Sequence, residues 1–332
     1  MRSVYIYIIV LLVFITTNVY SKDIYDNHGL GILNLRSQSV AQSLRLTLPM
    51  MIPNYIKKGY SFQGDLTWTN VWANRDDYML DYEMLEYTGG LSYGFESNWG
   101  IKVEILHREF VGGNMDRLIQ DFHDTFGIGQ NGRTDYPKNR HLINFYDQNT
   151  SSWRSADAEE LNNTGLNFLL NYDIYGNQYF PCFNLFAVGR YTIESVNFVK
   201  NVENFDYGVG IGITKRLTER IYAYAVLGYT FYRDDEVNTD SDLFVFEKEQ
   251  RTGMVALAWQ YHSELSFVCQ FLYGDPLIKN ISGLDEPSKE VHLGLKMRLF
   301  GKHIISLSLI ENVLIFDNSP DFGFHMGIQF AY

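Results

Sequence analysis

The amino-acid sequence predicts an all-β protein, a closed antiparallel transmembrane β-barrel of about 12 strands. Apolar and polar side chains alternate along many segments of strand length, as they do where one strand face contacts lipid and the other lines a lumen. The links between these segments alternate between short and long, as the turns and loops at the two ends of such a barrel do. The alternation is clearest in residues 322–332, at the end of the chain.

This C-terminal segment shows the pattern that the other strands repeat. One face carries Phe322, Phe324, Met326, Ile328, Phe330 and Tyr332, and the other Gly323, His325, Gly327, Gln329 and Ala331. Roughly 9–11 residues are enough for a tilted strand to cross a bilayer. The terminal aromatic residue resembles the signal that the barrel-assembly machinery of bacterial outer membranes reads, so we expect that machinery as a partner. The alternative is an edge strand of a soluble sandwich.

Composition excludes several classes of protein. The mean hydropathy of -0.17 argues against a bundle of membrane helices, whereas 16% aromatic residues suit strands and interfacial girdles. A chain of net charge -12 without a basic run is not expected to bind nucleic acid. Cys182 and Cys269 fall on opposite strand faces, one inward and one outward, so no disulfide is expected.

The N-terminus has the pattern of a targeting segment. Arg2 precedes an apolar run over residues 4–15, and a small residue, Ser21, offers a cleavage site. We therefore expect residues 1–21 to be a secretory signal peptide, the alternative being an uncleaved anchor. Residues 22–57 then form an N-terminal segment in the periplasm or the lumen, and residues 58–332 form the barrel.

Twelve segments of the barrel region alternate strongly enough to be strands. In chain order they are 62–72, 78–95, 101–105, 166–173, 183–191, 207–214, 221–232, 255–261, 265–274, 291–299, 305–309 and 322–332. The facing of 221–232 stays open. With an even strand number, both ends of the barrel lie on the periplasmic side, and the long links, above all 110–162, are extracellular.

The long link 110–162 contains an amphipathic helix. Its apolar side chains are Met115, Leu118, Ile119, Phe122 and Phe126, at helical spacing. Asn114 is the expected N-terminal cap and Gly127 the expected C-terminal one.

Residues around this helix resemble a known family, the bacterial outer-membrane proteins grouped as domain of unknown function 3187. The resemblance rests on residues 112–127, on Gly132-Arg133 and on residues 137–140. Residues 36–38 are similar to the family's Arg-x-Gln motif, although the proline that usually follows is absent. The resemblance implies a barrel in the outer membrane of a Gram-negative bacterium, in contact with its lipids and lipopolysaccharide, and it implies no activity.

No motif in the chain indicates a catalytic residue, a cofactor or a metal site. Gly90–Gly94 matches G-x-S-x-G, but it lies inside an alternating strand rather than at a strand-to-helix turn. The glycines of 208–212 also lie in a strand, so they do not form a dinucleotide-binding loop. His107 is expected to face outward near the outer rim, where a lipid hydrolase would need an outward serine beside it. No such serine is evident, which favours an interfacial polar residue.

Two groups of charged residues are candidates for a functional site. The first belongs to the helical link, as ligand or pore-lid residues: Asp116, Arg117, Asp121, His123, Asp124, Arg133 and Arg140. The second is expected to line the lumen: Lys102, Glu104, Arg190, Lys296 and Arg298. Our hypothesis is that residues 112–133 form a lid or plug whose carboxylates pair with Arg190, because buried charges need partners. The alternative is a solvated helix face.

These patterns favour a channel or transporter for a small polar or amphipathic solute. Two other functions remain open: an outer-membrane lipid-modifying enzyme, and a surface or structural barrel without transport. The sequence does not name the solute.

Overall fold

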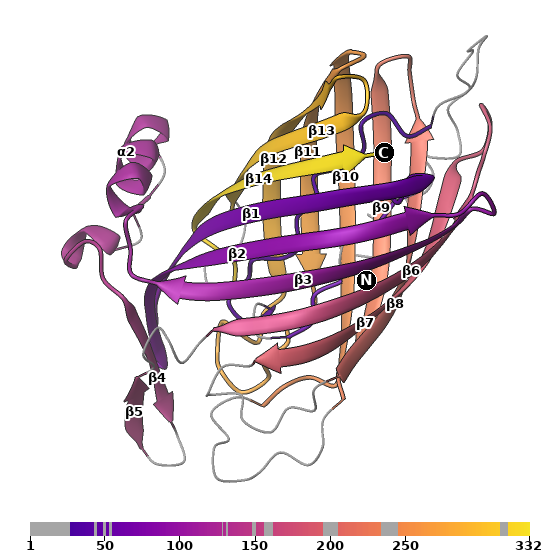
Figure 1. Ribbon diagram of the computed structural model, residues 1–332. Helices are drawn as coiled ribbons and strands as arrows, with labels where there is room; N and C mark the ends of the chain where they lie inside the picture. Colours follow the sequence, from indigo (N-terminus) through magenta and orange to yellow (C-terminus); the bar gives the residue numbers. More distant parts are fainter. Residues whose placement is uncertain are drawn as a thin grey trace.

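The computed structural model describes residues 27–42, 45–48, 51–52, 55–127, 129–130, 132–147, 151–155, 162–194, 205–233, 245–312 and 318–332. The expected signal peptide, residues 1–21, lies outside them. Within these ranges, twelve long antiparallel strands form the wall of a barrel (Figure 1). They are β1 Gly59–Asn74, β2 Tyr78–Gly94, β3 Trp99–Val111, β6 Asn163–Ile174, β7 Cys182–Glu194, β8 Phe205–Arg216, β9 Ile221–Phe231, β10 Glu249–His262, β11 Leu265–Gly274, β12 Ser288–Leu299, β13 His303–Glu311 and β14 Phe322–Ala331.

The link after β3 contains the remaining elements. These are helix α2 (Asp116–Phe126), a 3-10 turn (Arg133–Asp135) and a hairpin of β4 (Leu142–Asp147) and β5 (Ser152–Ser155), of which β4 pairs with the end of β2. Among the described residues, no helix is long and apolar enough to cross a membrane.

The wall is closed by its first and last strands. β1 pairs with β2 on one side and with β14 on the other, in a register that runs from Ser61 opposite Ala331 to Asn70 opposite Phe322. Closure leaves the wall without a free edge, so its backbone groups are paired within it. The predicted fold, a closed antiparallel transmembrane barrel of 12 strands with a short helix in its longest link, is confirmed.

Side chains of the wall separate by face as the alternation predicts. On β1, Ser61 is 2% exposed and its outward neighbour Phe62 is 44% exposed. Cys182 is buried and Cys269 is exposed, so they lie on opposite faces of the wall, as predicted. On β9, whose facing was open, Tyr222 and Tyr224 are buried inside the barrel.

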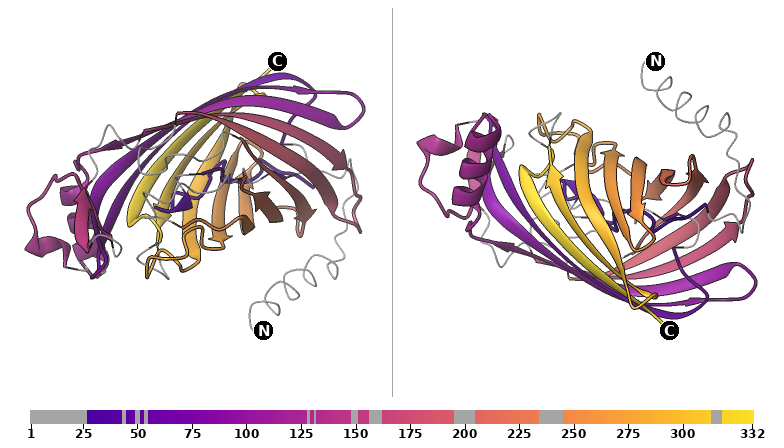
Figure 2. Two further views of the ribbon diagram at one scale, coloured as in Figure 1. Left: turned by 90° about the horizontal axis from the view of Figure 1, so that it is seen from below. Right: turned by 90° about the horizontal axis from the view of Figure 1, so that it is seen from above.

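The described part of residues 27–57, the luminal segment, lies inside the wall and forms no strand of it (Figure 2). At one end of the barrel, Asn27 accepts a hydrogen bond from the backbone N–H of Arg216 at 2.9 Å. At the other end, the Gln42 amide donates to Ser288 Oγ at 2.7 Å. The segment then returns to the start of β1. It therefore crosses the lumen twice.

The luminal segment and the inner wall share one apolar core. The segment contributes the buried side chains Ile32, Leu33, Leu35, Val40, Ala41, Leu46, Leu48, Met51, Ile52 and Ile56. Tyrosines of the wall also hold its backbone, because Tyr224 donates to the His28 carbonyl at 2.8 Å and Tyr232 to that of Leu46 at 2.9 Å. This contact explains why the inner face of β9 is apolar in sequence.

Glycine on β8 lets the segment approach the wall closely. A Cβ at Gly212 would overlap the Met51 carbonyl oxygen, and one at Gly208 would lie 2.7 Å from Leu48. Gly208 and Gly212 thus form a docking surface for the luminal segment. The described luminal segment thus occupies the lumen, apart from a cavity at one end.

The first prediction concerns closure. Deleting Phe330 to Tyr332 removes the pairs of Phe330 and Ala331 with β1 and the bond from Tyr332 N to Tyr60 O at 3.0 Å. An unpaired edge in lipid is costly, so we expect the truncated protein to lose the heat-dependent mobility shift of a folded barrel in gel electrophoresis. A normal amount of heat-modifiable protein in membranes would contradict this.

Candidate functional site

Charged groups of the wall hold the luminal segment at mid-height. Arg36 of the segment forms an ion pair with Glu104 of β3, which also pairs with Lys102 Nζ at 2.6 Å. Asn167 of β6 donates to the same carboxylate at 3.1 Å. Lys102 and Glu104, predicted to line the lumen, thus lie together inside the barrel and are buried.

Further polar contacts anchor the segment near the end of the barrel where the long links lie. Arg45 pairs with Asp206 of β8 at 2.5 Å, and Arg190 of β7 donates to the Arg45 carbonyl at 3.0 Å. Glu290 of β12 accepts bonds from Ser37 Oγ at 2.5 Å and from Gln38 N at 3.0 Å. Side chains rather than a backbone ladder therefore fix the segment.

A cavity of about 260 Å³ remains at the opposite end, between the luminal segment and strands β1, β12, β13 and β14. Lys296 and Arg298, both predicted to face the lumen, line it. Lys296 Nζ donates to the Ile32 carbonyl at 2.6 Å, so the lysine contacts the segment directly.

Helix α2 lies on the outer surface of the wall. Met115 and Ile119 are buried against Phe322 of β14, together with Phe122. The cluster also includes Trp68 of β1 and Phe324 of β14, whose side chains point outward. Part of the apolar stripe, Met115, Ile119 and Phe122, thus packs on aromatic residues of the outer face, whereas Leu118 is 47% exposed. Figure 1 shows the helix outside the barrel.

A carboxylate from the wall caps this helix. Glu83 of β2 accepts hydrogen bonds from the backbone N–H groups of Asn114 and Met115, and from Trp68 Nε1 at 2.7 Å. The prediction that Asn114 caps the helix is wrong. The cap position is Met115, whose side chain makes no capping hydrogen bond. A negative charge at a helix N-terminus is favourable, so Glu83 replaces a local cap. Gly127 ends the helix in the left-handed conformation, as predicted.

Arg133 ties the link to the wall. Its guanidinium pairs with Asp116 at 3.0 Å and with Asp321, just before β14, at 2.6 Å, and it donates to Asn70 Oδ1 at 2.7 Å. Burial raises the pKa of Asp321, and Arg133 opposes that rise. Arg140 Nε lies 3.8 Å from Asp81 Oδ2 of β2, a further ion pair between the link and the wall.

The other residues proposed for a lid do not meet the lumen either. Arg117 and Asp121 are exposed and 3.9 Å apart, and Asp124 accepts a bond from Gln130 at 2.8 Å. His123 is buried in the link. The hypothesis that helix carboxylates pair with Arg190 is wrong, because Asp116 pairs with Arg133, and Arg190 contacts Asn163 and the luminal segment. The apolar spacing of the helix predicts that one of its faces is buried, but it does not predict which surface of the protein covers that face.

A polar cluster on the outer face was missed in sequence. His107 of β3 bonds Thr164 Oγ1 of β6 at 2.8 Å through Nδ1 and Glu109 Oε1 at 3.1 Å through Nε2. Thr164 also lies 3.1 Å from Glu194 of β7, beside an irregularity in the β6–β7 register. The search for an outward serine passed over Thr164, although it shares the outward parity of Leu166.

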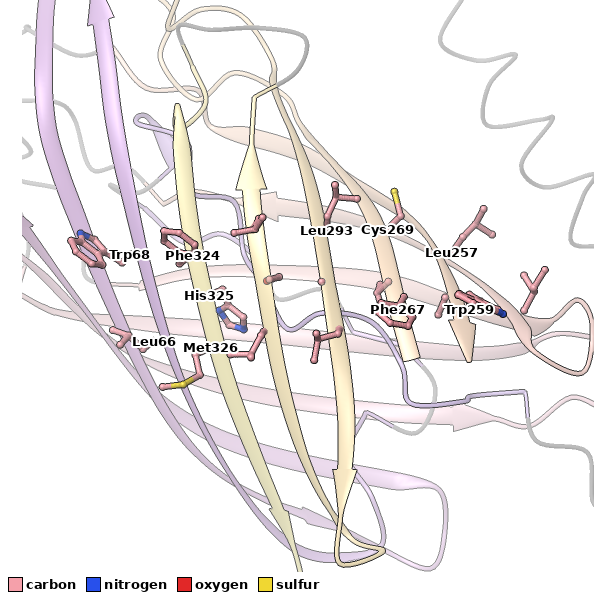
Figure 3. A pocket seen from close by; sticks show the side chains of 18 residues that line it. Leu66, Trp68, Leu257, Trp259, Phe267, Cys269, Leu293, Phe324, His325 and Met326 are labelled. Carbon is pink, nitrogen blue, oxygen red and sulfur yellow. The ribbon is translucent and has the colours of Figure 1, made fainter. Parts of the chain in front are cut away.

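The outer wall also has an apolar concavity of about 920 Å³, which spans β1 and β9 to β14. Trp68, Phe324 and Met326 lie at one side of it and Leu257, Trp259 and Phe267 at the other (Figure 3). These side chains belong to the outward face, so the concavity is a surface for lipid chains rather than part of the lumen.

These features define a class: a transmembrane β-barrel whose lumen is filled by its own N-terminal segment. The chain belongs to the family described as protein of unknown function (DUF3187), whose sequence profile matches residues 8–332. The resemblance seen around the helical link is therefore confirmed.

Solved structures of other barrels are similar to this chain at low identity. The NanC porin matches with TM-score 0.47 and 10% identity over 82% of this chain and 100% of that one. The KdgM porin matches with TM-score 0.44 and 8% identity over 82% and 99%, and the Pseudomonas putida toluene transporter TodX with 0.38 and 10% over 94% and 98%. A search of curated protein sequences finds no match.

The second prediction concerns the outer helix. Arg133→Ala leaves Asp116 and Asp321 buried without their cation, a loss of about 3–5 kcal/mol. We expect amide hydrogen exchange of residues 116–126 to rise strongly, while the wall strands keep their protection. The matched control is Arg117→Ala, which removes only an exposed contact and is worth at most about 0.5 kcal/mol. Equal exchange in the two variants would show that Arg133 does not hold the helix.

Proposed function

We propose that the protein is a gated channel for a small polar solute, with the luminal segment as its gate. One observation carries the proposal: the segment lies in the lumen and is held by side-chain contacts with the wall, which supplies charged and polar partners as well as apolar ones. Movement of the segment would leave a passage lined by Lys102, Glu104, Glu290 and other polar groups. A barrel with only a structural role needs no such lining, because an apolar core of equal volume is often at least as stable as buried ion pairs.

The proposed location is the bacterial outer membrane. An exposed apolar outer face requires a lipid environment, and residues 1–21 would direct export and be removed. Residues 22–57 then form the gate and 58–332 the barrel. Both ends of the barrel would face the periplasm and the link 110–162 the cell exterior, with lipopolysaccharide around it. Assembly there would need the barrel-assembly machinery.

The third prediction locks the gate. Asn27 Nδ2 lies 3.5 Å from Cys182 Sγ, so Asn27→Cys places two thiols within reach of a disulfide. In a Cys269→Ser background, we expect the oxidised variant to open at least about tenfold less often in planar bilayers, a difference of about 1.4 kcal/mol, and reduction to restore wild-type openings. Gly212→Val, which clashes with Met51, should raise the opening frequency.

Matched controls distinguish the effect of the disulfide on opening from the effect of the oxidant and reductant themselves. Asn27→Ser in the same background must show no redox response. Wild-type openings in a variant shown by mass to carry the disulfide would contradict the gate. Absence of openings in every variant, Gly212→Val included, would contradict the channel.

A second candidate function, modification of lipid esters, is favoured by the outer polar cluster. With Nε2–H of His107 donated to Glu109, Nδ1 is free to accept the Thr164 hydroxyl proton. Thr164 Oγ1 would attack the ester carbonyl, and His107 would pass the proton to the departing alcohol. Water would then hydrolyse the acyl-threonine, with His107 again taking a proton. The hydrogen bond to Glu194 competes for the same hydroxyl.

The fourth prediction tests this candidate in mixed micelles of phospholipid and detergent. If the cluster is catalytic, Thr164→Val should lower fatty-acid release by at least about 100-fold. Thr192→Val, at a neighbouring position of β7, should leave the rate unchanged. No release by the wild type above a protein-free blank would eliminate this candidate and would leave the channel unaffected.

A further inference from the structure

The 260 Å³ cavity of the lumen carries an excess of positive charge. Its described lining includes three cationic side chains, Lys57 from the luminal segment and Lys296 and Arg298 from β12. The same lining includes one carboxylate, Asp65 of β1. The whole chain, in contrast, has a net charge of -12, so the local sign is opposite to that of the protein.

Asp65 is already engaged by neutral donors. Its Oδ2 accepts hydrogen bonds from Asn34 Nδ2 at 3.0 Å, Gln63 Nε2 at 2.8 Å and Thr88 Oγ1 at 3.0 Å. Its ion-pair neighbour is His325, 3.7 Å from Oδ1. Asp65 therefore does not form an ion pair with either cation of β12.

Lys296 and Arg298 retain unused donors. Among the described residues, neither side chain has a carboxylate within ion-pair distance, and the Lys296 ammonium, which has three protons, donates to the Ile32 carbonyl. Both side chains are half-buried. An anion in the cavity would therefore gain charged hydrogen bonds from both side chains, and it would offset the cost of holding them partly out of water.

A turn of the luminal segment lies directly beside Lys296. This turn, closed by a hydrogen bond from Gly31 N to His28 O at 3.1 Å, lines the cavity. Gly31 has φ 79°, a conformation that disfavours other residues, so the turn requires glycine there. A Cβ at Gly31 would lie 3.6 Å from Lys296 Nζ, so the turn and the ammonium are neighbours in the cavity wall.

We propose that this cavity binds a small organic anion, a carboxylate or a phosphate ester. A volume of about 260 Å³ lies just below the range of about 300–1,000 Å³ for drug-sized ligands, which suits a compound of monosaccharide size. Guanidinium and ammonium donors recognise both groups. This inference rests on the proposed function in one respect: it names the class of solute that the proposed channel would pass.

Calorimetric titration of the full-length protein in detergent micelles tests the site. Glucuronate, glucose 6-phosphate and glucose are the probes, in about 0.15 M sodium chloride so that weak screening contacts are suppressed. We expect saturable binding of one or both anions and none of glucose. The two anionic probes distinguish a carboxylate site from a phosphate site.

Variants of the lining connect that binding to the cavity. Lys296→Gln and Arg298→Gln should each raise the Kd of the bound anion by at least about tenfold, since each substitution removes a charged hydrogen bond to the anion. Lys302→Gln, an exposed cation in the β12–β13 turn outside the cavity, is the matched control and should leave the Kd unchanged. Heat-dependent gel mobility confirms that each variant is folded.

Three results would overturn the site: no saturable binding of either anion, equal binding of glucose, or an equal loss in Lys302→Gln. None of these results bears on the disulfide experiment, so the proposed channel is tested separately from the anion site. Conversely, anion binding that depends on Lys296 in a protein that never conducts would support the site and refute the channel.

Discussion

Backbone pairing in lipid is the constraint on which the rest of this structure depends. A spanning strand can satisfy its amide and carbonyl groups only from neighbouring strands, so the wall must close. The seam between β1 and β14 completes that closure, and it makes the C-terminal residues part of the wall rather than a tail. Closure at twelve strands then sets the width of the interior, which must either admit water or be filled.

This chain fills its interior with a segment from its own N-terminus, and the inner wall is shaped for it. Glycines of β8 admit the segment backbone, tyrosines of β9 and the following loop hold its carbonyls, and charged groups such as Glu104 and Asp206 pair with its arginines. Backbone hydrogen bonds join the strands of the wall to one another, whereas side-chain contacts hold the segment inside the lumen. The two parts are therefore held by different kinds of contact, as the wall and the movable part of a gate must be.

The strands could be predicted from sequence because lipid on one side imposes a period of two residues on each of them. The opposite facing of Cys182 and Cys269 followed from the same period. The luminal segment could be placed no more closely than the periplasm or the lumen, because its described residues form no strand and so carry no period of two residues. Strand β9 was ambiguous for a related reason, since its inner face packs on the apolar side chains of that segment.

The helix in the long link shows a different limit of sequence reasoning. Its stripe predicts a buried face, and Met115 and Ile119 are buried whereas Leu118 is exposed. Trp68 and Phe324, which receive the buried part, are indistinguishable in sequence from lipid-facing residues. Glu83 and Arg133 are distant in the chain from the groups they bind, so neither the cap nor the ion pairs have a local signal. Lys296 and Arg298 were correctly expected to line the lumen, whereas the cavity beside them depends on the placement of the luminal segment.

The central claim is that the luminal segment is a unit separate from the wall. Hydrogen exchange of the protein in lipid vesicles, resolved by residue, measures the opening free energy of each part most directly. The account predicts that residues 27–57 exchange together, at an opening free energy clearly below that of strands β1 to β14. If those residues exchanged only when the wall strands did, the segment would be an inseparable part of the barrel core, and the gate would be refuted.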